Sequence, residues 1–205
     1  MFTGLIKEMA TVVSFEDNIL TLNAKYSPNI GDSIAINGAC LTVISFTNDT
    51  FSVELSPESQ TNLAIENYKD LVHIEPAMSM GDRFEGHIVQ GHIDCIGVIN
   101  EIKDNGNSTD FFITIPKEQI KFVIQKGSVT VDGISLTIND IFEDSFRLTI
   151  IPHTIENTLF KDYQIGSRVN IETDMFARYI YNIFKKDSSN KDLNWDSIDN
   201  IMATY

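Results

Sequence analysis

Residues 33–43 read SIAINGACLTV and residues 128–138 read SVTVDGISLTI, so the chain contains nearly the same phrase twice. The two stretches start 95 residues apart (128 minus 33). Self-similarity at a fixed offset indicates that one structural unit has been duplicated. In a chain of 205 residues, the repeat predicts two halves of about 90–100 residues, each within the usual size of a domain.

Further matches between the halves keep the same order, which favours duplication over chance. They are FTGLI (2–6) with QGHID (90–94), FSVELSPESQTNL (51–63) with FRLTIIPHTIENTL (146–159), and VHIEPAM (72–78) with VNIETDM (169–175). We therefore expect an N-terminal domain over 1–86 and a C-terminal domain over 87–173. A helix over 174–186 and a polar tail over 187–205 would follow.

Most segments have the composition of β-strands. They are short, rich in Val, Ile, Thr and Phe, and interrupted by Gly, Asn, Asp and Pro. This pattern predicts an all-β protein built of small barrels or sandwiches. Helices are expected only after SPES at 56–59, over 116–124 and over 174–186.

The last of these helices is amphipathic. Phe176, Tyr179, Ile180 and Ile183 fall on one face at helical spacing. An apolar stripe on a terminal helix often packs against copies of itself in an oligomer. The alternative is that it lies back on its own barrel, and we favour the oligomer.

Composition excludes several classes of function. The net charge of −14 argues against a nucleic-acid partner, because such binding needs clustered Lys and Arg. No apolar run is long enough to span a membrane, and MFTGLIKEMA lacks the pattern of a secretory leader. Two cysteines without a CxxC motif fit a reducing compartment. We expect a cytoplasmic protein with neither a membrane nor a nucleic-acid partner.

The repeated phrase predicts a β-hairpin in each half. Asn37-Gly38 and Asp132-Gly133 are strong signals for a two-residue type I′ turn. Strand alternation then assigns the residues of each hairpin to two faces. The core faces comprise Ile34, Ile36, Ala39, Leu41 and Val43 in the first copy, and Val129, Val131, Ile134, Leu136 and Ile138 in the second.

The opposite faces carry small polar side chains at matching positions. They are Cys40 and Thr42 in the first copy, and Thr130, Ser135 and Thr137 in the second. A solvated strand usually carries long charged residues there, whereas small uncharged ones suit the close approach of a ligand. The alternative is that Thr is simply a good strand former and Cys a small buried hydrophobe. Because both copies share the pattern, we favour a pair of related ligand sites.

Other polar residues are open to two interpretations. His87 and His92, in EGHIVQGHID, are suited to acid–base chemistry near neutral pH, but each is equally compatible with a structural hydrogen bond. Lys126 could serve the second hairpin or be merely solvated, and Asp174 could simply cap the last helix. His73 is expected to be structural. No GxxxxGK[ST], GxGxxG or HExxH motif is present.

These residues together resemble the riboflavin synthase family, the type with tandem barrels in one chain. The matching motifs are MFTGLI, NGACLTV, TNL at 61–63, GHIVQGHID, KGSVTVDGISLTI, IPHT and GSRVNIETD. The segment AIENYKDLVHIEPA departs from the family pattern, because it lacks a glycine turn. The resemblance implies two six-stranded Greek-key barrels related by duplication, plus a C-terminal helix.

The resemblance also implies an activity. Two molecules of 6,7-dimethyl-8-ribityllumazine would react by transfer of a four-carbon unit, giving riboflavin and 5-amino-6-ribitylamino-pyrimidinedione. The enzyme would be a transferase that needs no metal or cofactor. It would form a homotrimer through the C-terminal helix, with each active site shared between neighbouring subunits, and association with lumazine synthase would be a further assembly. The alternative is a non-catalytic lumazine- or flavin-binding protein of the same fold.

Site residues are carried over from the family by motif. The first-barrel contacts would be Gly4, Leu5, Ile6, Cys40, Leu41, Thr42, Glu54, Leu55, Ser56, Pro57, Glu58 and Ser59. The second-barrel contacts would be Gly91, His92, Ile93, Lys126, Ser135, Leu136, Thr137, Ile151, Pro152, His153, Thr154, Ile155 and Glu156. Cys40, Ser135 or a water that they hold would be the nucleophile, and His92 with Thr137 would move protons. Supporting or charge-stabilising roles would fall to Lys126, Asp132, Asp174 and His87.

Overall fold

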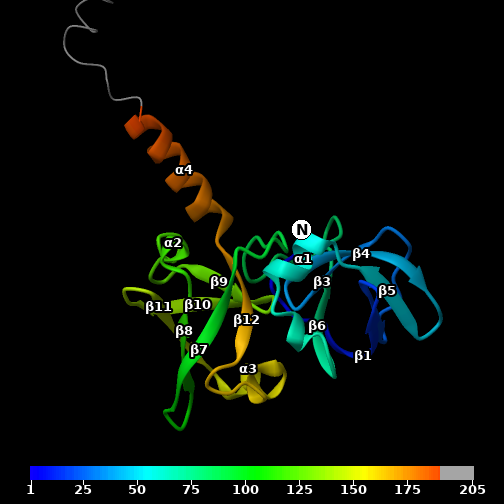
Figure 1. Ribbon diagram of the computed structural model, residues 1–205. Helices are drawn as coiled ribbons and strands as arrows, with labels where there is room; N and C mark the ends of the chain where they lie inside the picture. Colours follow the sequence, from blue (N-terminus) through cyan, green and yellow to red (C-terminus); the bar gives the residue numbers. More distant parts are fainter. Residues whose placement is uncertain (190–205) are drawn as a thin grey trace, which may run out of the picture.

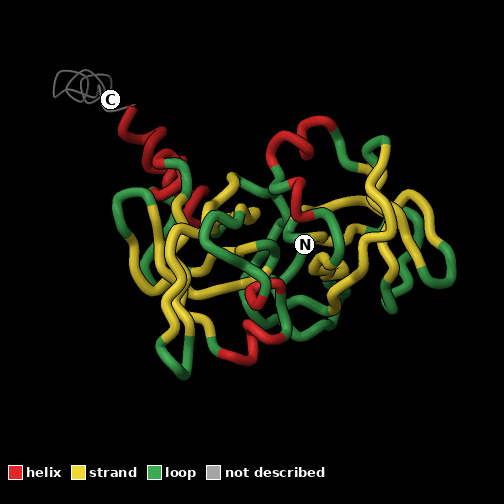
Figure 2. Tube along the Cα trace, turned by 60° about the horizontal axis from the view of Figure 1, so that its bottom comes forward, coloured by secondary structure: helices red, strands yellow, loops and turns green. Residues whose placement is uncertain are grey.

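The computed structural model describes residues 1–189 and shows two closed β-barrels side by side (Figures 1 and 2). The first barrel consists of β1 (Glu8–Glu16), β2 (Ile19–Asn23), β3 (Ser33–Ile36), β4 (Ala39–Phe46), β5 (Thr50–Glu54) and β6 (Leu71–Pro76). The second consists of β7 (Cys95–Asp104), β8 (Thr109–Thr114), β9 (Ser128–Val131), β10 (Ile134–Ile141), β11 (Ser145–Ile150) and β12 (Arg168–Thr173).

Strand order is the same in both barrels. It runs β1-β2-β5-β4-β3-β6 in the first barrel, and the second repeats it as β7-β8-β11-β10-β9-β12. Neighbouring strands pair antiparallel, and each barrel closes on its own cluster of buried aliphatic and aromatic side chains. The expected all-β fold of two duplicated six-stranded barrels is therefore confirmed.

Short helices fill the connections. They are α1 (Pro57–Asn62), η1 (Ile65–Asn67), α2 (Lys117–Ile120), α3 (Pro152–Glu156) and η2 (Leu159–Lys161), followed by α4 (Met175–Ser189). The helix expected over 116–124 is thus only one turn long. The IPHT motif lies at the start of α3, where Pro152 occupies the first turn, a position that suits its fixed φ and missing N–H.

Both predicted hairpins are present with type I′ geometry. Asn37 and Gly38 have φ of 43° and 82°, and Asp132 and Gly133 have φ of 44° and 83°. The two turns meet back to back, because a Cβ added to Gly38 would lie 2.7 Å from the backbone nitrogen of Gly133. Glycine is therefore needed here for close packing as well as for backbone conformation.

The predicted core faces are buried except at Leu136, which is only partly covered. The opposite faces are not uniformly open, because Ala35 and Thr130 are also buried. Ala35 packs with Phe2 and Val89, which belong to segments that cover the hairpins from outside. The Thr130 side chain lies against β12, where its hydroxyl donates to the Glu172 carbonyl at 3.5 Å. This correction to the expected faces arises from tertiary contacts, with the covering segments at Ala35 and with the neighbouring strand β12 at Thr130, which strand alternation does not predict.

The segments that precede β1 and β7 exchange barrels, and we call residues 2–6 and 89–93 the crossover segments. Ser135 N–H donates to the Gly4 carbonyl, and Cys40 N–H donates to the Gly91 carbonyl, each at 2.8 Å. The crossover segments meet one another at the Phe2–Val89 bridge, and the N-terminus accordingly lies between the barrels in Figures 1 and 2. Each crossover segment therefore covers the hairpin of the other half.

Paired polar contacts hold the two barrels together. His73 Nδ1 lies 3.0 Å from the Asp132 carbonyl, and its Nε2 accepts the Leu159 N–H at 2.8 Å. Asn170 makes the equivalent contacts in the other half, donating to the Asn37 carbonyl and accepting the Ala64 N–H, each at 2.8 Å. His73 is fully buried, so the structural role expected for it agrees with its position.

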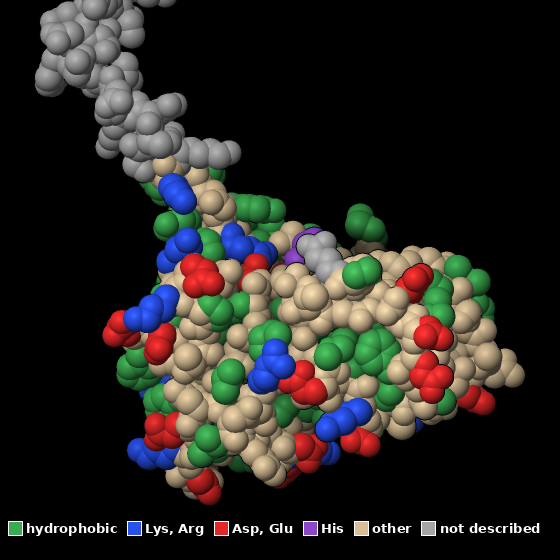
Figure 3. Space-filling model, in the orientation of Figure 1, with side chains coloured by type: hydrophobic (Ala, Val, Ile, Leu, Met, Phe, Trp, Pro, Cys, Tyr) green, Lys and Arg blue, Asp and Glu red, His purple; other side chains and the backbone are tan. Residues whose placement is uncertain are grey.

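The terminal helix α4 projects from the second barrel (Figure 1). Its first half rests on the segment after α2, with the rings of Phe122 and Tyr181 edge to face at a centroid separation of 5.3 Å. The expected stripe of Phe176, Tyr179, Ile180 and Ile183 stays more than half exposed, and hydrophobic side chains are visible along the helix in Figure 3. Within the described residues, no helix has the length and hydrophobicity needed to cross a membrane. The expected tail over 187–205 lies mostly outside the described residues.

Candidate functional site

Each hairpin and the crossover segment that covers it form one candidate site. The Cys40 site contains Cys40 and Thr42 from β4, the segment 54–59, and residues 91–93 from the other half. The Ser135 site contains Ser135 and Thr137 from β10, Lys126, His87 and residues 4–6 from the other half. Both sites are thus built by the two barrels together.

Cys40 lies between two adjoining hollows. One, of about 440 Å³, is lined by Thr42, Glu54 and Ser56 among others, and the second, of about 360 Å³, by Ser59, Asn62 and His92 among others. Ser56 also caps α1 by accepting the Ser59 N–H at 3.1 Å. The Cys40 site therefore offers hydroxyl and amide groups, together with the Glu54 carboxylate and the His92 imidazole, around a half-buried thiol, which suits a polar ligand without negative charge.

The second cysteine has a different environment. Cys95 is half-buried at the start of β7, and burial raises the pKa of its thiol to about 12, with further increases from Asp94 and Glu118. Because the thiolate is the nucleophilic form, Cys95 is unreactive near neutral pH. Of the two cysteines, Cys40 is the one placed to react with a ligand.

Ser135 has an acid–base partner. Its hydroxyl oxygen lies 2.7 Å from Nδ1 of His87, which is itself nearly buried. Burial lowers the pKa of His87, and the Asp174 carboxylate partly offsets this effect. A neutral imidazole beside a serine hydroxyl can accept its proton, so the Ser135 site can generate or stabilise an oxygen nucleophile.

Two other predicted residues belong to the same hairpin. Thr137 is exposed on β10 opposite Ser128, next to Ser135 on the same face. Lys126 has a positive φ of 64°, and its N–H donates to the Ile138 carbonyl at 2.9 Å. The backbone around Lys126 is therefore fixed, while its ammonium group stays exposed to solvent.

Buried carboxylates hold both crossover segments in place. Glu172 accepts the N–H groups of Gln90, Gly91 and His92 at 2.7, 2.8 and 3.1 Å. Glu75 accepts the Thr3 N–H and hydroxyl, each at 2.7 Å, and the Gly4 N–H at 3.0 Å. Burial raises the pKa of Glu75, and it raises the pKa of Glu172 to about 7 against the opposing effect of these hydrogen bonds.

The structure rearranges the expected grouping of site residues. Gly4, Leu5 and Ile6 were expected beside Cys40, but they lie on the Ser135 hairpin. Gly91, His92 and Ile93 were expected beside Ser135, but they lie on the Cys40 hairpin. The expectation followed chain order, whereas each crossover segment passes to the opposite barrel. His92 and Thr137, expected to move protons together, consequently belong to different sites within one chain.

Asp132 does not face either site, contrary to the supporting role expected for it. It is fully buried between the barrels, where it accepts the Asn170 N–H at 2.7 Å and the Tyr163 hydroxyl. Burial raises its pKa to about 7. Asp132 therefore stabilises the junction of the barrels rather than charge on a ligand.

The remaining predicted ligand contacts lie at the end of β5, around α1 and α3, and beside Cys40 and Ser135 on the hairpins. Glu54 ends β5, Leu55 is buried in the first core, and residues 56–59 enter α1. In the second half, Ile151 is exposed and residues 152–156 form α3, where His153 and Glu156 line a hollow of about 560 Å³ together with Ile6. Leu41 is buried beneath Cys40 and Leu136 is partly buried beneath Ser135.

Three residues that matter to the site were missed at the sequence level. Glu75 and Glu172 occupy matching positions in VHIEPAM and VNIETDM, so the repeat itself carried a signal for them. Phe2 is fully buried between the halves, and nothing in its local sequence indicates this.

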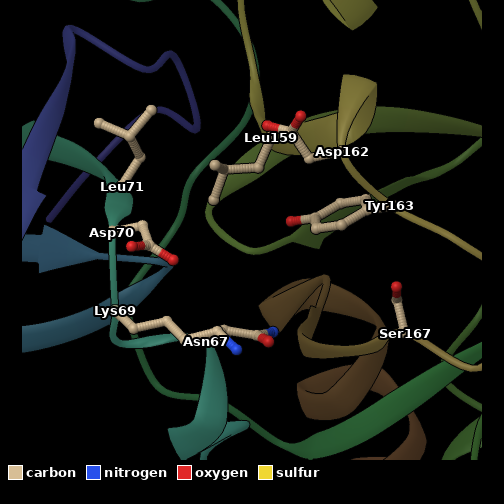
Figure 4. Close-up of a pocket in the computed structure, with 8 residues that line it drawn as sticks. All are labelled: Asn67, Lys69, Asp70, Leu71, Leu159, Asp162, Tyr163 and Ser167. Atoms are coloured by element: carbon tan, nitrogen blue, oxygen red, sulfur yellow. The ribbon is translucent and has the colours of Figure 1, made fainter.

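A separate cleft of about 340 Å³ lies between the barrels (Figure 4). One wall comes from the segment before β6, with Asn67, Lys69 and Asp70, and the other from the segment before β12, with Asp162 and Tyr163. It contains none of the predicted site residues, so we assign the function to the hairpin sites instead. Among the described residues, no group of three or more His, Cys, Asp or Glu side chains could hold a metal ion.

Known proteins resemble this chain in sequence and in fold. The model of the lumazine binding domain matches residues 3–77 and 90–174. Riboflavin synthases of Bacillus subtilis and Photobacterium phosphoreum are each 40% identical to it, covering 93% and 88% of this chain and 93% and 87% of their own. The enzyme of Saccharomyces cerevisiae is 37% identical over 88% of this chain and 84% of its own.

Solved structures support the fold. LumP, in a crystal structure with riboflavin, superposes with a TM-score of 0.74 at 19% identity, covering 85% of this chain and 100% of LumP. LumP with 6,7-dimethyl-8-(1'-D-ribityl) lumazine gives a TM-score of 0.71 at 20% identity, covering 85% and 99%. On its identity to the curated enzymes over almost their whole length, with a lumazine binding domain in each half, this chain belongs to the riboflavin synthase family.

Proposed function

We propose that this chain is a cytoplasmic transferase that converts two molecules of 6,7-dimethyl-8-ribityllumazine into riboflavin and 5-amino-6-ribitylamino-pyrimidinedione. A four-carbon unit leaves one lumazine and joins the other, so the atoms of two substrates equal those of two products. The observation that carries the proposal is the pair of matched sites around Cys40 and Ser135, in a chain about 40% identical to riboflavin synthases. Two copies of one site suit a reaction whose two substrates are the same molecule.

Different chemistry at the two sites supports different roles for the two lumazines. The Ser135 site has a serine hydroxyl against a neutral His87, with Asp174 nearby. The Cys40 site has a half-buried thiol, with His92 lining the same hollow. Proton removal from a ring methyl and nucleophilic addition at the adjacent ring carbon each need such a group. Cys40, Ser135 or a water that they hold is the proposed nucleophile.

Assembly of the active site would require a neighbouring subunit. His92 and Thr137 lie in different sites of one chain, so joint proton transfer requires the Cys40 site of one chain to face the Ser135 site of another. The exposed stripe on α4 offers a surface for this contact. We propose a homotrimer, which sedimentation of the purified protein would test, and adding lumazine synthase to the same sample would test association with that enzyme.

The test is to incubate the purified protein with the lumazine and to follow riboflavin absorbance. Time-dependent appearance of riboflavin supports the enzyme, and Cys40→Ser and Ser135→Ala should each slow it. A change in lumazine fluorescence without new absorbance would instead support the non-catalytic binding protein. If both variants turned over at the rate of the parent protein, the assignment of the nucleophile would be wrong.

A further inference from the structure

The buried carboxylate of Glu172 controls a segment that belongs to the opposite site. It is only 1% exposed, and its two oxygens accept three consecutive N–H groups, those of Gln90, Gly91 and His92. The Gly91 carbonyl in turn accepts the Cys40 N–H at 2.8 Å. A residue of the second barrel thus fixes the wall of the Cys40 site.

Glu75 has the reciprocal arrangement. It lies on β6 of the first barrel, is 3% exposed, and accepts the N–H groups of Thr3 and Gly4. The Gly4 carbonyl accepts the Ser135 N–H at 2.8 Å. Each site is therefore held in shape by a carboxylate from the barrel that does not contain its hairpin.

The packing leaves little room for these segments to shift. A Cβ added to Gly91 would lie 2.6 Å from Cβ of Cys40, and one added to Gly4 would lie 2.5 Å from Cβ of Ser135. Buried N–H groups that lose their acceptor carry a large desolvation penalty, so a weakened carboxylate contact would displace the segment. Any displacement of the crossover segment would therefore also move the hairpin residue it contacts, Cys40 or Ser135.

One of the two arrangements also extends to the terminal helix. Arg178 on α4 donates to the Gln90 side-chain oxygen at 2.8 Å and to the Asp94 carboxylate, and it lies 4.0 Å from Glu172. Asp94 also accepts the N–H and hydroxyl of Thr173, at 2.8 and 2.7 Å. Glu75 has no such link among the described contacts, and the cation that acts on it is Lys7.

We propose that Glu172 is a positioning residue for the Cys40 site, that Glu75 is its counterpart for the Ser135 site, and that Arg178 ties the Cys40 site alone to α4. The inference rests on the proposed function in taking both hairpins as ligand sites. It adds that the sites are fixed crosswise, and that the Arg178 side chain on α4 acts on the Cys40 site through Gln90 and Glu172 and not on the Ser135 site.

The experiment measures ligand binding at each site separately, with riboflavin as the probe. Iodoacetamide labels Cys40 in the parent protein, and protection of Cys40 by increasing riboflavin gives a dissociation constant for the Cys40 site. The double variant Cys40→Ser/Ser135→Cys moves the reactive thiol to position 135 and reports the Ser135 site. Cys95 stays unlabelled in both proteins, because burial raises its pKa to about 12.

Glu172→Gln should raise the dissociation constant read at Cys40 about tenfold, the effect of one lost hydrogen bond to a charged group. The constant read at position 135 should change less than about twofold. Glu75→Gln, the matched variant, should give the opposite pattern. Arg178→Met should weaken binding only at Cys40, by about threefold, because Glu172 keeps its N–H donors.

The outcomes separate the two proposals. If riboflavin protects neither Cys40 in the parent protein nor the thiol introduced at position 135 in the double variant, the ligand sites of the proposed function are wrong. If it protects both, but the two Gln variants weaken both sites equally or neither, the crosswise positioning is wrong. A thermal melt of each variant checks folding. If Glu172→Gln does not fold, Arg178→Met decides, because unchanged protection of Cys40 by riboflavin in that variant would overturn the link between the Cys40 site and α4.

Discussion

The Ser135 hydroxyl oxygen lies 2.7 Å from Nδ1 of His87, and this contact distinguishes the two otherwise matched sites. His87 lies in the connection that enters the second half, and the Ser135 hairpin belongs to that half as well. The Cys40 N–H to Gly91 carbonyl bond matches the Ser135 N–H to Gly4 carbonyl bond, but among the described hydrogen bonds none joins the Cys40 side chain to a histidine. The duplicated fold therefore contains one site in which an imidazole contacts the candidate nucleophile and one in which no such contact is made among the described residues.

The pH dependence of turnover should reflect His87. Burial lowers its pKa, so the imidazole stays neutral at pH 7 and turnover should decline only below the ordinary histidine range, where it gains a proton. His87→Gln keeps a hydrogen-bonding side chain but no base, and we expect kcat to fall by about 10²-fold. The pH–rate profile of both proteins is the measurement. Ser45→Ala, in an exposed serine of β4, is the control, and an unchanged profile in His87→Gln would contradict the role.

The back-to-back hairpin turns should make Gly38 and Gly133 intolerant of a side chain. Gly38→Ala adds a Cβ at 2.7 Å from Gly133 N as well as the strain of a φ of 82°. Gly106→Ala is the matched control, because Gly106 has a φ of 83° with nothing within 4 Å. We expect Gly106→Ala to lower the free energy of unfolding by about 1–2 kcal/mol and Gly38→Ala to lower it further. Urea unfolding, with an unchanged m-value, measures the loss of unfolding free energy in each variant. Equal losses in the two variants would mean that the two turns do not contact each other.

His73 should make the junction of the barrels sensitive to acid. Burial lowers its pKa from 6.5 to about 4, so between these values the unfolded chain binds more protons and His73 contributes less stability as pH falls. The loss amounts to about 3 kcal/mol once pH is below 4. The raised pKa of Asp132, about 7, acts in the opposite direction over a similar range.

A comparison with His73→Asn separates the two groups, because both proteins keep Asp132. Asn170 makes the equivalent contacts in the other half, which makes Asn a reasonable substitute. The unfolding free energy of the parent protein minus that of His73→Asn should decrease by about 3 kcal/mol from pH 7 to pH 4. Urea unfolding at several pH values measures it, and a constant difference would show that His73 titrates normally.

Alkylation should distinguish the two cysteines. With a thiol pKa of about 12, only about one in 10⁴ Cys95 side chains is a thiolate at pH 8. We expect iodoacetamide to modify one residue per folded chain, with peptide mass spectrometry placing the label at Cys40. Cys40→Ser should remain unmodified until denaturant is added, and rapid labelling of Cys95 in the folded protein would contradict the raised pKa of its thiol.

The α4 stripe should hold the proposed trimer together. Tyr179→Glu with Ile183→Glu places charges in an exposed apolar face, so sedimentation should change from a trimer to a monomer with the circular dichroism spectrum retained. Asn182→Glu adds charge outside the stripe of the same helix and should leave the trimer intact. A parent protein that sediments as a monomer would overturn the assembly, and with it the shared active site.

The local structure of each half was determined by the sequence. Val, Ile and Thr at alternating positions define the strands, and Asn37-Gly38 and Asp132-Gly133 define the turns, because these are short-range preferences of the chain. Duplication was also visible, since both copies of the phrase retain the same pattern. The identities of Cys40 and Ser135 as matched residues followed from the repeat alone.

Tertiary structure decided which residues face each other. Gly4 could be matched to Gly91 in the sequence, but only the fold shows that each crosses to the opposite barrel and contacts Ser135 or Cys40. Ala35 is buried by the crossover segments and Thr130 by its contact with β12, although strand alternation places both on the outer face. Long-range contacts depend on how two folded halves pack, and no local preference specifies that. The sequence therefore determined two similar sites, and the packing of the halves determined that each is completed by the other.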